Sequence, residues 1–578
     1  MLHRRLPFIF LFLLLFLEKS LSIQNETELP IIPKPKSQTI GNNTFVINKC
    51  TLKKIVNSNP NIKNDINDLL QFYSEKMFYK PIVCNEENSM KNFQNEIRYL
   101  IINVNPNQSI LLPDDFNQTD EQYNLSIVAE NLIIIEAISY AGFVRGIESL
   151  AQLINPNTDD NKTYYIDNCP LYVYDYPSYK VRGLMIDLSR HFFQIQVLNN
   201  VINAMMYSKL NILHLHLSDD DSYPLESITF PDLTNYTTFK GNNNFYSIQQ
   251  MKNLIYFAQT RAVHIIPEFD NPGHVRSVGN HPNFTEAVVC HDLINGFKNP
   301  GGLNLTINGG PPNGNLDPTM NISYTLVDGI INDILNIFNN SKYIHLGGDE
   351  VIYRCWDTRP SIKEYMNEHG IDSYEDLFSL YLANVRQNLT LKNDSKVAIY
   401  WVNSATIDIK YSPSDILQYW GNSSFLSTFL QNHPYNPIII SSYDFHYLDC
   451  GLGGLYGNGA IWCDPFKSWL MIYSYNLYKF ASNSNKILGI IATSWDETTS
   501  EVALETKLFP RGISLGEILW SNITEIPDLT SITKRITAQS RRMRLWGIRC
   551  NAIGRQWCED YPEICYANYH QDLNSFIF

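Results

Sequence analysis

Two adjacent carboxylates near the middle of the 578-residue chain have the chemistry of an acid catalyst. They are Asp349 and Glu350, and they follow a short, largely apolar run at residues 343–346 and the pair Gly347-Gly348. A glycine lets backbone or ligand approach closely, and a buried carboxylate is costly unless it is paired. The pattern fits a strand that presents acid chemistry at its end, and equally a glycine turn followed by two solvated acids. The surrounding elements must decide between these two interpretations.

Eight apolar runs recur along the chain with helical stretches between them. Continuous apolar runs are typical of parallel strands buried on both faces, and eight of them match a (β/α)8 TIM barrel. A doubly wound open sheet would also alternate strands and helices, but its ligand crevice would lie at one switch point. We therefore predict an α/β fold with a TIM barrel. The runs cover residues 183–187, 212–217, 264–269, 343–346, 397–401, 416–420, 437–441 and 487–493.

Polar or aromatic side chains follow nearly every one of these runs. In a barrel, all of them would lie at the C-terminal rim, where active sites are found. Carboxylates beside indoles suit a ligand with apolar faces and hydroxyl edges, and a sugar ring has both. The residues are Asp187, Arg190, Asp219, Glu268, His274, Asp349, Glu350, Trp401, Trp420, Tyr447, Asp449 and Trp495.

The first third of the chain predicts a small α/β domain ahead of the barrel. Strand-like and helical runs alternate there, and Phe143, Ile147 and Leu150 share one helical face. The Pro- and Tyr-rich residues 170–177 read as a linker. We predict a signal peptide at 1–22, an N-terminal α/β domain at 23–176, the catalytic barrel at 177–553 and a disulfide-containing tail at 554–578.

The N-terminus and the composition indicate the compartment and exclude some partners. Arg4 and Arg5 precede an apolar run at residues 8–17, which predicts a secretory signal, with a retained signal-anchor as the alternative. No later run reaches the length of a membrane span, so we expect no stable membrane insertion. A net charge of −14 argues against a nucleic-acid partner. The protein is expected in the lysosome or outside the cell.

Asn-X-Ser/Thr sequons are dense and are candidate glycosylation sites in a secreted chain. The ten cysteines lack paired zinc-type spacing, so disulfides are expected. The candidate sequons are at Asn25, Asn42, Asn107, Asn117, Asn124, Asn161, Asn235, Asn283, Asn304, Asn321, Asn339, Asn388, Asn393, Asn422 and Asn522.

Other chemistries fit the sequence less well. His214 and His216 alternate on one predicted strand and could share a metal, but Trp401 and Trp420 stand where further ligands would be needed. We expect no metal and no cofactor, and read the histidines as hydrogen-bonded supports. No Gly-X-Ser-X-Gly motif marks a serine nucleophile. Glycoside hydrolysis remains, but it normally needs two carboxylates facing each other across the bond, and adjacent residues diverge.

Four motifs together resemble the family 20 β-N-acetylhexosaminidases. This resemblance implies substrate-assisted catalysis, in which the 2-acetamido oxygen of the sugar replaces the second carboxylate. Glu350 would be the general acid, Asp349 would hold the acetamido N–H, and Tyr447 would orient the acetamido oxygen. The motifs are Ser189-Arg190-His191, residues 214–220 (HLHLSDD), residues 267–274 (PEFDNPGH) and residues 345–350 (HLGGDE).

The resemblance also implies the groups that hold the sugar. For the charged groups the alternative interpretation is a surface ion pair, and for the tryptophans it is a place in the apolar core. Arg190, Asp449 and Glu497 would bind the sugar hydroxyls. Trp401, Trp420 and Trp495 would form aromatic walls around the acetamido group. Asp219 and His274 would form a dyad that supports the acid.

The resemblance further implies disulfides and a substrate class. A bridge between Cys450 and Cys463 resembles a loop of fungal-type members, and Asp449 with Cys450 favours neutral terminal GlcNAc and GalNAc over sulfated or sialylated sugars. Alternatives are a catalytically silent glycan-binding relative and a chitobiose-degrading enzyme. A homodimer is permitted. The other expected bridges are Cys290–Cys355, Cys558–Cys565 and Cys50–Cys84, which leaves Cys169 and Cys550 free or bonded to each other.

Overall fold

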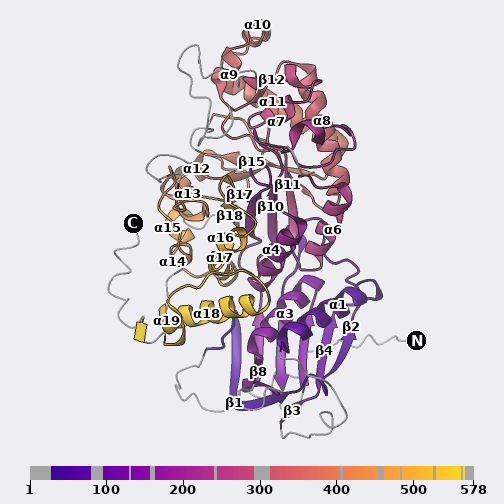
Figure 1. Cartoon of the computed structure of the whole chain (residues 1–578), viewed down its shortest axis with the longest axis vertical. Coiled ribbons are helices and arrows are strands. Elements are labelled where there is room, and N and C mark those ends of the chain that lie inside the picture. The colour runs from indigo at the N-terminus through magenta and orange to yellow at the C-terminus, as the bar shows by residue number, and fades with distance from the viewer. Residues whose placement is uncertain are drawn as a thin grey trace, which may run out of the picture.

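The computed structural model shows a barrel stacked on a smaller α/β domain (Figure 1). In this view the barrel forms the upper part of the molecule and the N-terminal domain the lower part. The structure describes residues 28–79, 95–128, 132–156, 163–239, 244–291, 313–403, 406, 408–453, 461–481, 485–524, 529–561 and 564–565.

The eight predicted runs form the eight strands of one closed parallel barrel, so the predicted fold class is confirmed. The last strand pairs with the first, with Gly489 opposite Val181 and Ser494 opposite Ile186. The strands are β9 (Val181–Asp187), β10 (Ile212–His216), β11 (His264–Glu268), β14 (Tyr343–His345), β15 (Val397–Val402), β16 (Ile416–Tyr419), β17 (Ile438–Ile440) and β18 (Ile487–Ser494).

Apolar side chains fill the barrel interior, which explains why the strands read as continuous runs. Met185, Ile266, Ile399 and Ile491 belong to one buried cluster that also contains Trp401. The second face of the strands packs on the surrounding helices. These include α4 (Ile195–Tyr207), α6 (Ile248–Gln259), α8 (Asn321–Ile337), α11 (Tyr374–Lys392), α12 (Leu426–Asn432), α15 (Leu477–Ala481) and α17 (Arg511–Ser521).

The loops after the barrel strands carry short elements that build the rim. The disulfide Cys290–Cys355 joins the loop after β11 to the loop after β14. These elements are α5 (Thr234–Thr237), α7 (Arg276–Gly279), η2 (Thr285–Ala287), β12 (Val288–Val289), β13 (Asn315–Leu316), α9 (Tyr353–Asp357), α10 (Pro360–His369), η5 (Ser423–Phe425), α13 (Tyr443–His446), α14 (Trp469–Tyr473) and α16 (Leu504–Leu508).

The N-terminal domain is a mixed eight-stranded sheet with the order β2-β4-β6-β5-β8-β1-β3, in which β7 also pairs with β8. Helices α1 (Pro60–Met77) and α3 (Tyr140–Leu153) lie between this sheet and the barrel in Figure 1. Its other elements are β1 (Ser37–Ile47), β2 (Lys53–Asn57), β3 (Glu96–Ile97), β4 (Tyr99–Val104), η1 (Phe116–Gln118), β5 (Tyr123–Val128), β6 (Leu132–Ala137), β7 (Asn155–Pro156) and β8 (Tyr164–Asp175).

The predicted linker at residues 170–177 is wrong, because most of it is the end of strand β8. Leu171, Val173 and Asp175 are buried, whereas Tyr172 and Tyr174 point to the other face. This is the period-two alternation of a strand, and tyrosine is common in strands. Pro170 and Pro177 favoured the interpretation as a linker over the strand alternation. The chain therefore leaves the N-terminal sheet only after Asp175.

Helix α3 is buried on every side, and not only on the predicted face, because the barrel covers its outer face. Arg145 on this helix donates to the carbonyls of Leu210 (3.2 Å) and Ala262 (2.8 Å) at the base of the barrel. Glu121 accepts hydrogen bonds from Arg145 Nε (2.8 Å) and from Arg182 Nη2 (2.6 Å) on β9. A buried carboxylate with two guanidinium partners therefore joins the two units.

The last long helix returns to the N-terminal domain. Helix α18 (Leu529–Leu545) lies beside α3 in Figure 1, and Gln539 Nε2 donates to Glu148 Oε1 (3.1 Å). Just after the helix, Trp546 Nε1 donates to the carbonyl of Lys76 (3.0 Å). The short helix α19 (Gln556–Asp560) follows. None of the helices among the described residues is long and apolar enough to cross a membrane.

The described cysteines pair as the resemblance implies. Disulfides join Cys290 to Cys355, Cys450 to Cys463 and Cys558 to Cys565. Cys50 is also disulfide-bonded, and its expected partner Cys84 lies outside the described residues. Cys169 and Cys550 are both free and buried, so they are not bonded to each other.

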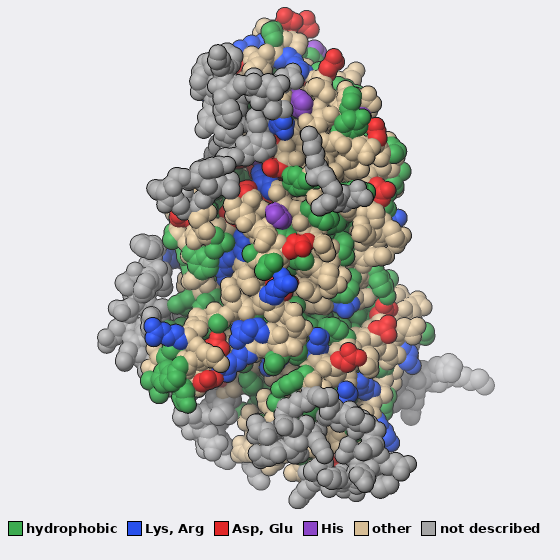
Figure 2. Space-filling model, viewed as in Figure 1, with side chains coloured by type: hydrophobic (Ala, Val, Ile, Leu, Met, Phe, Trp, Pro, Cys, Tyr) green, Lys and Arg blue, Asp and Glu red, His purple; other side chains and the backbone are tan. Residues whose placement is uncertain are grey.

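The candidate sequons differ in exposure. Asn42, Asn107, Asn117, Asn235, Asn283, Asn321 and Asn339 are exposed, Asn124, Asn388, Asn393, Asn422 and Asn522 are half-buried, and Asn25, Asn161 and Asn304 lie outside the described residues. Asn117 Nδ2 donates to the hydroxyl of Tyr343 (2.9 Å), so a glycan there would require this contact to break. Figure 2 shows acidic and basic side chains interspersed over one face of the molecule.

Candidate active site

Ten of the eleven predicted site residues line one cavity at the C-terminal rim of the barrel. The eleventh, Trp401, is fully buried behind Trp495, with 5.8 Å between the ring centroids. Trp462 also lines the cavity and was missed from the sequence. Trp462 could have been predicted from its position directly before Cys463, in the loop that the resemblance expects a disulfide to close. The lining residues are Arg190, Asp219, His274, Asp349, Glu350, Trp420, Tyr447, Asp449, Trp462, Trp495 and Glu497.

The two adjacent carboxylates are separated by the backbone that follows β14. Gly347 has φ +63°, and a Cβ there would lie 1.7 Å from Asp270 Oδ1, so only glycine fits. Asp349 is buried, with 9% exposure, whereas the side chain of Glu350 is 35% exposed. The strand therefore presents one acid inside the pocket and one at its opening. This arrangement decides against the simple glycine turn with two solvated acids.

Glu350 faces an imidazole that is itself held by a carboxylate. His274 Nε2 lies 3.3 Å from Glu350 Oε2, and His274 Nδ1 lies 3.1 Å from Asp219 Oδ1. Burial opposes a charge on the ring, but Asp219 first, with Asp220 and Glu350, raises the pKa of His274 well above its usual range. His274 is therefore an imidazolium placed between two carboxyl groups.

Asp349 lies beside a second buried acid, Asp270. Burial and the charge of Asp349 raise the pKa of Asp270 well above its usual range, and burial raises the pKa of Asp349 as well. Asp270 Oδ1 accepts a hydrogen bond from the backbone N–H of Gly348 (2.9 Å). The pair therefore disfavours two negative charges at once, so one proton shared between Asp270 and Asp349 is compatible with a single anion here.

Arg190 is surrounded by carboxylates at one end of the cavity. Its Nη2 lies 2.7 Å from Asp219 Oδ2 and its Nη1 lies 3.1 Å from Asp187 Oδ2. Its Nε lies 3.9 Å from oxygens of both Asp221 and Glu497. Burial opposes the charge, yet these carboxylates raise the pKa of Arg190 well above its usual range. A guanidinium fixed in this way is ready to donate to hydroxyl groups.

Aromatic rings form the walls of the cavity. The ring centroid of Tyr447 lies 5.9 Å from that of Trp462 and 6.3 Å from that of Trp495, and the centroids of Trp420 and Trp462 are 6.4 Å apart. Asp449 is held nearby by the backbone N–H of Trp495 (3.4 Å). Burial raises the pKa of Asp449 to about 7. Rings and a polar edge at this spacing suit a saccharide.

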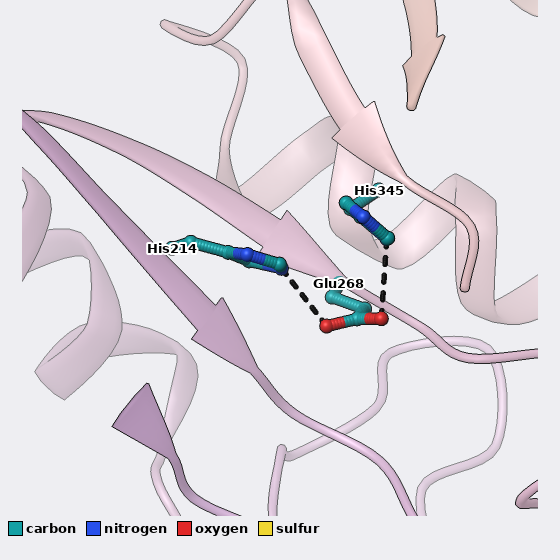
Figure 3. A group of neighbouring side chains, drawn as sticks. All are labelled: His214, Glu268 and His345. Carbon is teal, nitrogen blue, oxygen red and sulfur yellow. Dashed lines mark ion pairs between the residues drawn. The ribbon is translucent and has the colours of Figure 1, made fainter. Parts of the chain in front are cut away.

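A buried polar group lies deeper in the barrel, under this cavity. Figure 3 shows His214 on β10 and His345 on β14 pointing toward Glu268 on β11, the strand between them. His214 Nε2 lies 2.8 Å from Glu268 Oε2, and His345 Nδ1 lies 3.1 Å from Glu268 Oε1. Such donors resemble a zinc site, but Glu268 already accepts hydrogen bonds from Trp401 Nε1 (2.7 Å) and His216 Nδ1 (2.7 Å). These hydrogen bonds are enough to stabilise the buried carboxylate of Glu268 without a metal ion.

The chain matches family models over most of its length. The model described as "Glycosyl hydrolase family 20, catalytic domain" matches residues 179–523, and "beta-acetyl hexosaminidase like" matches residues 31–153. The "Probable beta-hexosaminidase fdl" of Drosophila melanogaster is 30% identical over 480 residues, which are 79% of this chain and 69% of that protein. The "Beta-hexosaminidase subunit beta" of Homo sapiens is 28% identical over 445 residues, 76% and 73% of the two chains.

Solved structures share the fold. An exo β-N-acetylglucosaminidase from Vibrio harveyi, in complex with N-acetylglucosamine, has a TM-score of 0.73 at 22% identity, over 91% of this chain and 79% of that one. A β-N-acetylhexosaminidase from Streptomyces coelicolor has a TM-score of 0.68 at 19% identity, over 91% and 98% of the two chains. At these identities the likeness is one of fold.

Proposed function

Because the chain belongs to glycosyl hydrolase family 20 and is a β-N-acetylhexosaminidase of that family, we propose that it removes single terminal, non-reducing β-linked GlcNAc or GalNAc residues. The proposed mechanism retains the anomeric configuration and uses the substrate's own acetamido group as nucleophile. The observation that supports it is the unequal placement of Asp349 and Glu350, one buried beside Asp270 and one at the opening beside His274.

Glu350 is the proposed general acid and base. It gives its proton to the glycosidic oxygen as the bond from that oxygen to the anomeric carbon breaks, and it becomes a carboxylate. The His274 imidazolium, 3.3 Å away, stabilises this new negative charge. In the second step, Glu350 takes a proton from the water that attacks the anomeric carbon.

Asp349 and Tyr447 act on the acetamido group. The acetamido oxygen attacks the anomeric carbon as the leaving group departs, and a cyclic oxazolinium ion forms. Asp349 accepts the acetamido N–H and balances the positive charge of the ring, while the hydroxyl of Tyr447 donates to the acetamido oxygen. Water then opens the ring from the face that the leaving group left, which returns the β-anomer. Trp420 and Trp495 enclose the group and exclude other water.

The remaining groups select the terminal sugar. Arg190, Asp449 and Glu497 form a polar set that would bind the ring hydroxyls. Carboxylates outnumber cations in this cavity, so a sulfate or a sialic acid on the terminal sugar would meet like charge. The preferred substrates are therefore neutral glycoconjugates with terminal N-acetylhexosamine.

The disulfides support passage through the secretory pathway, where such bonds form. The predicted signal peptide lies outside the described residues. We propose delivery to the lysosome or to the exterior.

The test is hydrolysis of 4-nitrophenyl β-GlcNAc and β-GalNAc by the purified protein. We expect both to be cleaved, the first-formed sugar to be the β-anomer by NMR, and a thiazoline mimic of the cyclised acetamido group to inhibit strongly. A first-formed α-anomer, or no effect of the thiazoline, would contradict the mechanism. Binding of GlcNAc without any turnover would instead support a silent glycan-binding relative.

A further inference from the structure

Glu268 at the end of β11 is fully buried and lies at the centre of a set of nitrogen atoms. Its Oε1 accepts from Trp401 Nε1 at 2.7 Å, and its Oε2 lies 2.7 Å from His216 Nδ1. The same Oε2 lies 2.8 Å from His214 Nε2, a contact drawn in Figure 3. The backbone N–H of Gly347 donates to His345 Nδ1 (3.0 Å), so Trp401 rather than His345 satisfies Oε1. Glu268 is not among the residues that line the cavity.

His216 lies between two carboxylates. Its Nδ1 faces Glu268 Oε2 at 2.7 Å, and its Nε2 faces Asp219 Oδ2 at 2.9 Å. Ionised carboxylates only accept hydrogen bonds, so both ring nitrogens must carry protons, and the ring is a buried imidazolium. It donates in two opposite directions.

Asp219 continues this chain of contacts to the proposed acid. Its Oδ2 is held by His216 and Arg190, and its Oδ1 holds His274 Nδ1 at 3.1 Å. His274 Nε2 in turn reaches Glu350 at 3.3 Å. From Glu268 to Glu350, carboxylate and imidazolium alternate over five side chains, and four of these five are buried.

We propose that Glu268 is a positioning residue of the reaction: it keeps His216 a double donor, and so fixes Asp219 and His274 in the line that aligns Glu350 with the leaving oxygen. The inference rests on the proposed function, because it needs Glu350 to be the acid. Without an anion at position 268, His216 requires only one proton. Its hold on Asp219 then depends on pH.

The titratable groups around His216 lie on or directly after three strands, β9, β10 and β11. They are Glu268 on β11, Asp219 after β10, Asp187 on β9 and Asp270 after β11, with His214 on the same strand as His216. Burial opposes the ring's charge, but Glu268 first, with Asp219 and Asp187, raises the pKa of His216 well above its usual range. Because its two ring nitrogens face two carboxylates, we expect the ring in wild type to stay charged throughout the assay range.

The test compares Glu268→Gln with wild type on three GlcNAc glycosides whose leaving groups become progressively worse, 2,4-dinitrophenyl, 4-nitrophenyl and 4-methylumbelliferyl. Misalignment of an acid is felt most where the leaving group most needs a proton. We expect kcat to fall by about tenfold for the first and by about a hundredfold for the last, which is the lower end of what a general acid contributes. The ratio of variant to wild-type activity should also fall as pH rises from 5 to 8, because His216 loses its second proton.

Two further variants separate positioning from folding. Glu268→Asp keeps the charge on a shorter side chain, so its defect should not change with pH. Glu148→Gln makes the same change at another fully buried carboxylate, which accepts from Tyr73 (2.7 Å) and Gln152 (2.9 Å) in the N-terminal domain. It should lower stability but leave the leaving-group and pH dependence as in wild type.

Histidine NMR gives a readout that does not depend on turnover. The 13Cε1 signal of His216, assigned by its absence in His216→Gln, should show a doubly protonated ring in wild type across pH 5 to 8 and a titrating ring in Glu268→Gln.

The outcomes are distinct. A loss in Glu268→Gln that is equal for all glycosides and all pH values, or a His216 ring that behaves alike in both proteins, would overturn the role of Glu268 and leave the proposed function standing. A wild-type protein inactive on all three glycosides would overturn the proposed function itself. If Glu268→Gln does not fold, a pH-dependent defect in Glu268→Asp would overturn the inference.

Discussion

Glu350 and His274 face each other across 3.3 Å, and both have a left-handed backbone, with φ of 49° and 55°. Residues with a Cβ rarely adopt this conformation, and it persists where the surrounding structure imposes it. Each follows a glycine or a glycine-containing turn at the end of a barrel strand. The strain at these two positions aims the acid and its imidazolium at the same point of the cavity.

Replacing the proposed acid tests the central assignment. Glu350→Gln should lower kcat for 4-nitrophenyl GlcNAc by about a thousandfold, because the amide cannot give or take the proton. Binding of the thiazoline inhibitor, measured by calorimetry, should change little. Glu368→Gln on the exposed face of α10 is the matched control and should behave as wild type. Near-normal turnover in Glu350→Gln would remove Glu350 from the role.

The glycine before the acids should be irreplaceable. Gly347→Ala places a Cβ 1.7 Å from Asp270 Oδ1, which forces the strand end or Asp270 to move. We expect a loss of about 3 kcal/mol or more in the free energy of unfolding, together with loss of activity. Gly370→Ala is the control, because Gly370 also has a left-handed φ of 64° but no atom within 4 Å of the added Cβ. It should cost only about 1 kcal/mol. Equal costs in the two variants, measured by urea unfolding, would contradict the steric argument.

Asp449 should make the protein less stable as pH rises. Burial raises its pKa in the folded protein to about 7, above the value near 4 of an unfolded chain. Between these pH values the folded state binds more protons than the unfolded state. The contribution of Asp449 to the free energy of unfolding therefore falls as pH rises from about 4 to about 7. Asp449→Asn should flatten that part of the curve of melting temperature against pH. An unchanged slope would show that Asp449 ionises normally.

The bridge between Cys450 and Cys463 should matter for binding more than for chemistry. It holds the loop that carries Asp449 and Trp462 against the cavity. The double variant Cys450→Ser/Cys463→Ser should raise KM by about tenfold with a smaller change in kcat, because the lost contacts are made equally in ground and transition states. The same double change at Cys558 in α19 and at Cys565, neither of which lines the cavity, should leave both constants unchanged. A fall in kcat alone would argue against this reading.

The buried carboxylate between the domains should be essential for stability. Glu121→Gln leaves Arg145 and Arg182 buried without their anion, which costs about 3–5 kcal/mol in comparable cases. Glu136→Gln on the exposed side of the N-terminal sheet is the control and should cost little. Thermal unfolding measures both. A similar melting temperature for the two variants would show that water reaches the interface.

The sequence predicted the structure correctly where a single local pattern determines it. Continuous apolar runs marked all eight barrel strands, because strands buried on both faces leave no polar alternation. The sequence did not predict how deeply a side chain is buried in the folded protein. Trp401 at the end of a strand looks like Trp420 at the end of the next, yet Trp401 is fully buried. The partners of Glu268 come from three other strands, β10, β14 and β15, and no spacing in the chain reveals that they meet.

Helix α18 has a consequence for how this protein is made. Its residues contact the first domain through Gln539 and Glu148, and the segment after it contacts Lys76 through Trp546. A ribosome releases the N-terminal domain long before it has synthesised these partners, so that domain waits with one side uncovered until nearly the whole chain has emerged. Co-translational folding of this protein therefore cannot finish one domain at a time, and its early intermediate is the species most in need of a chaperone.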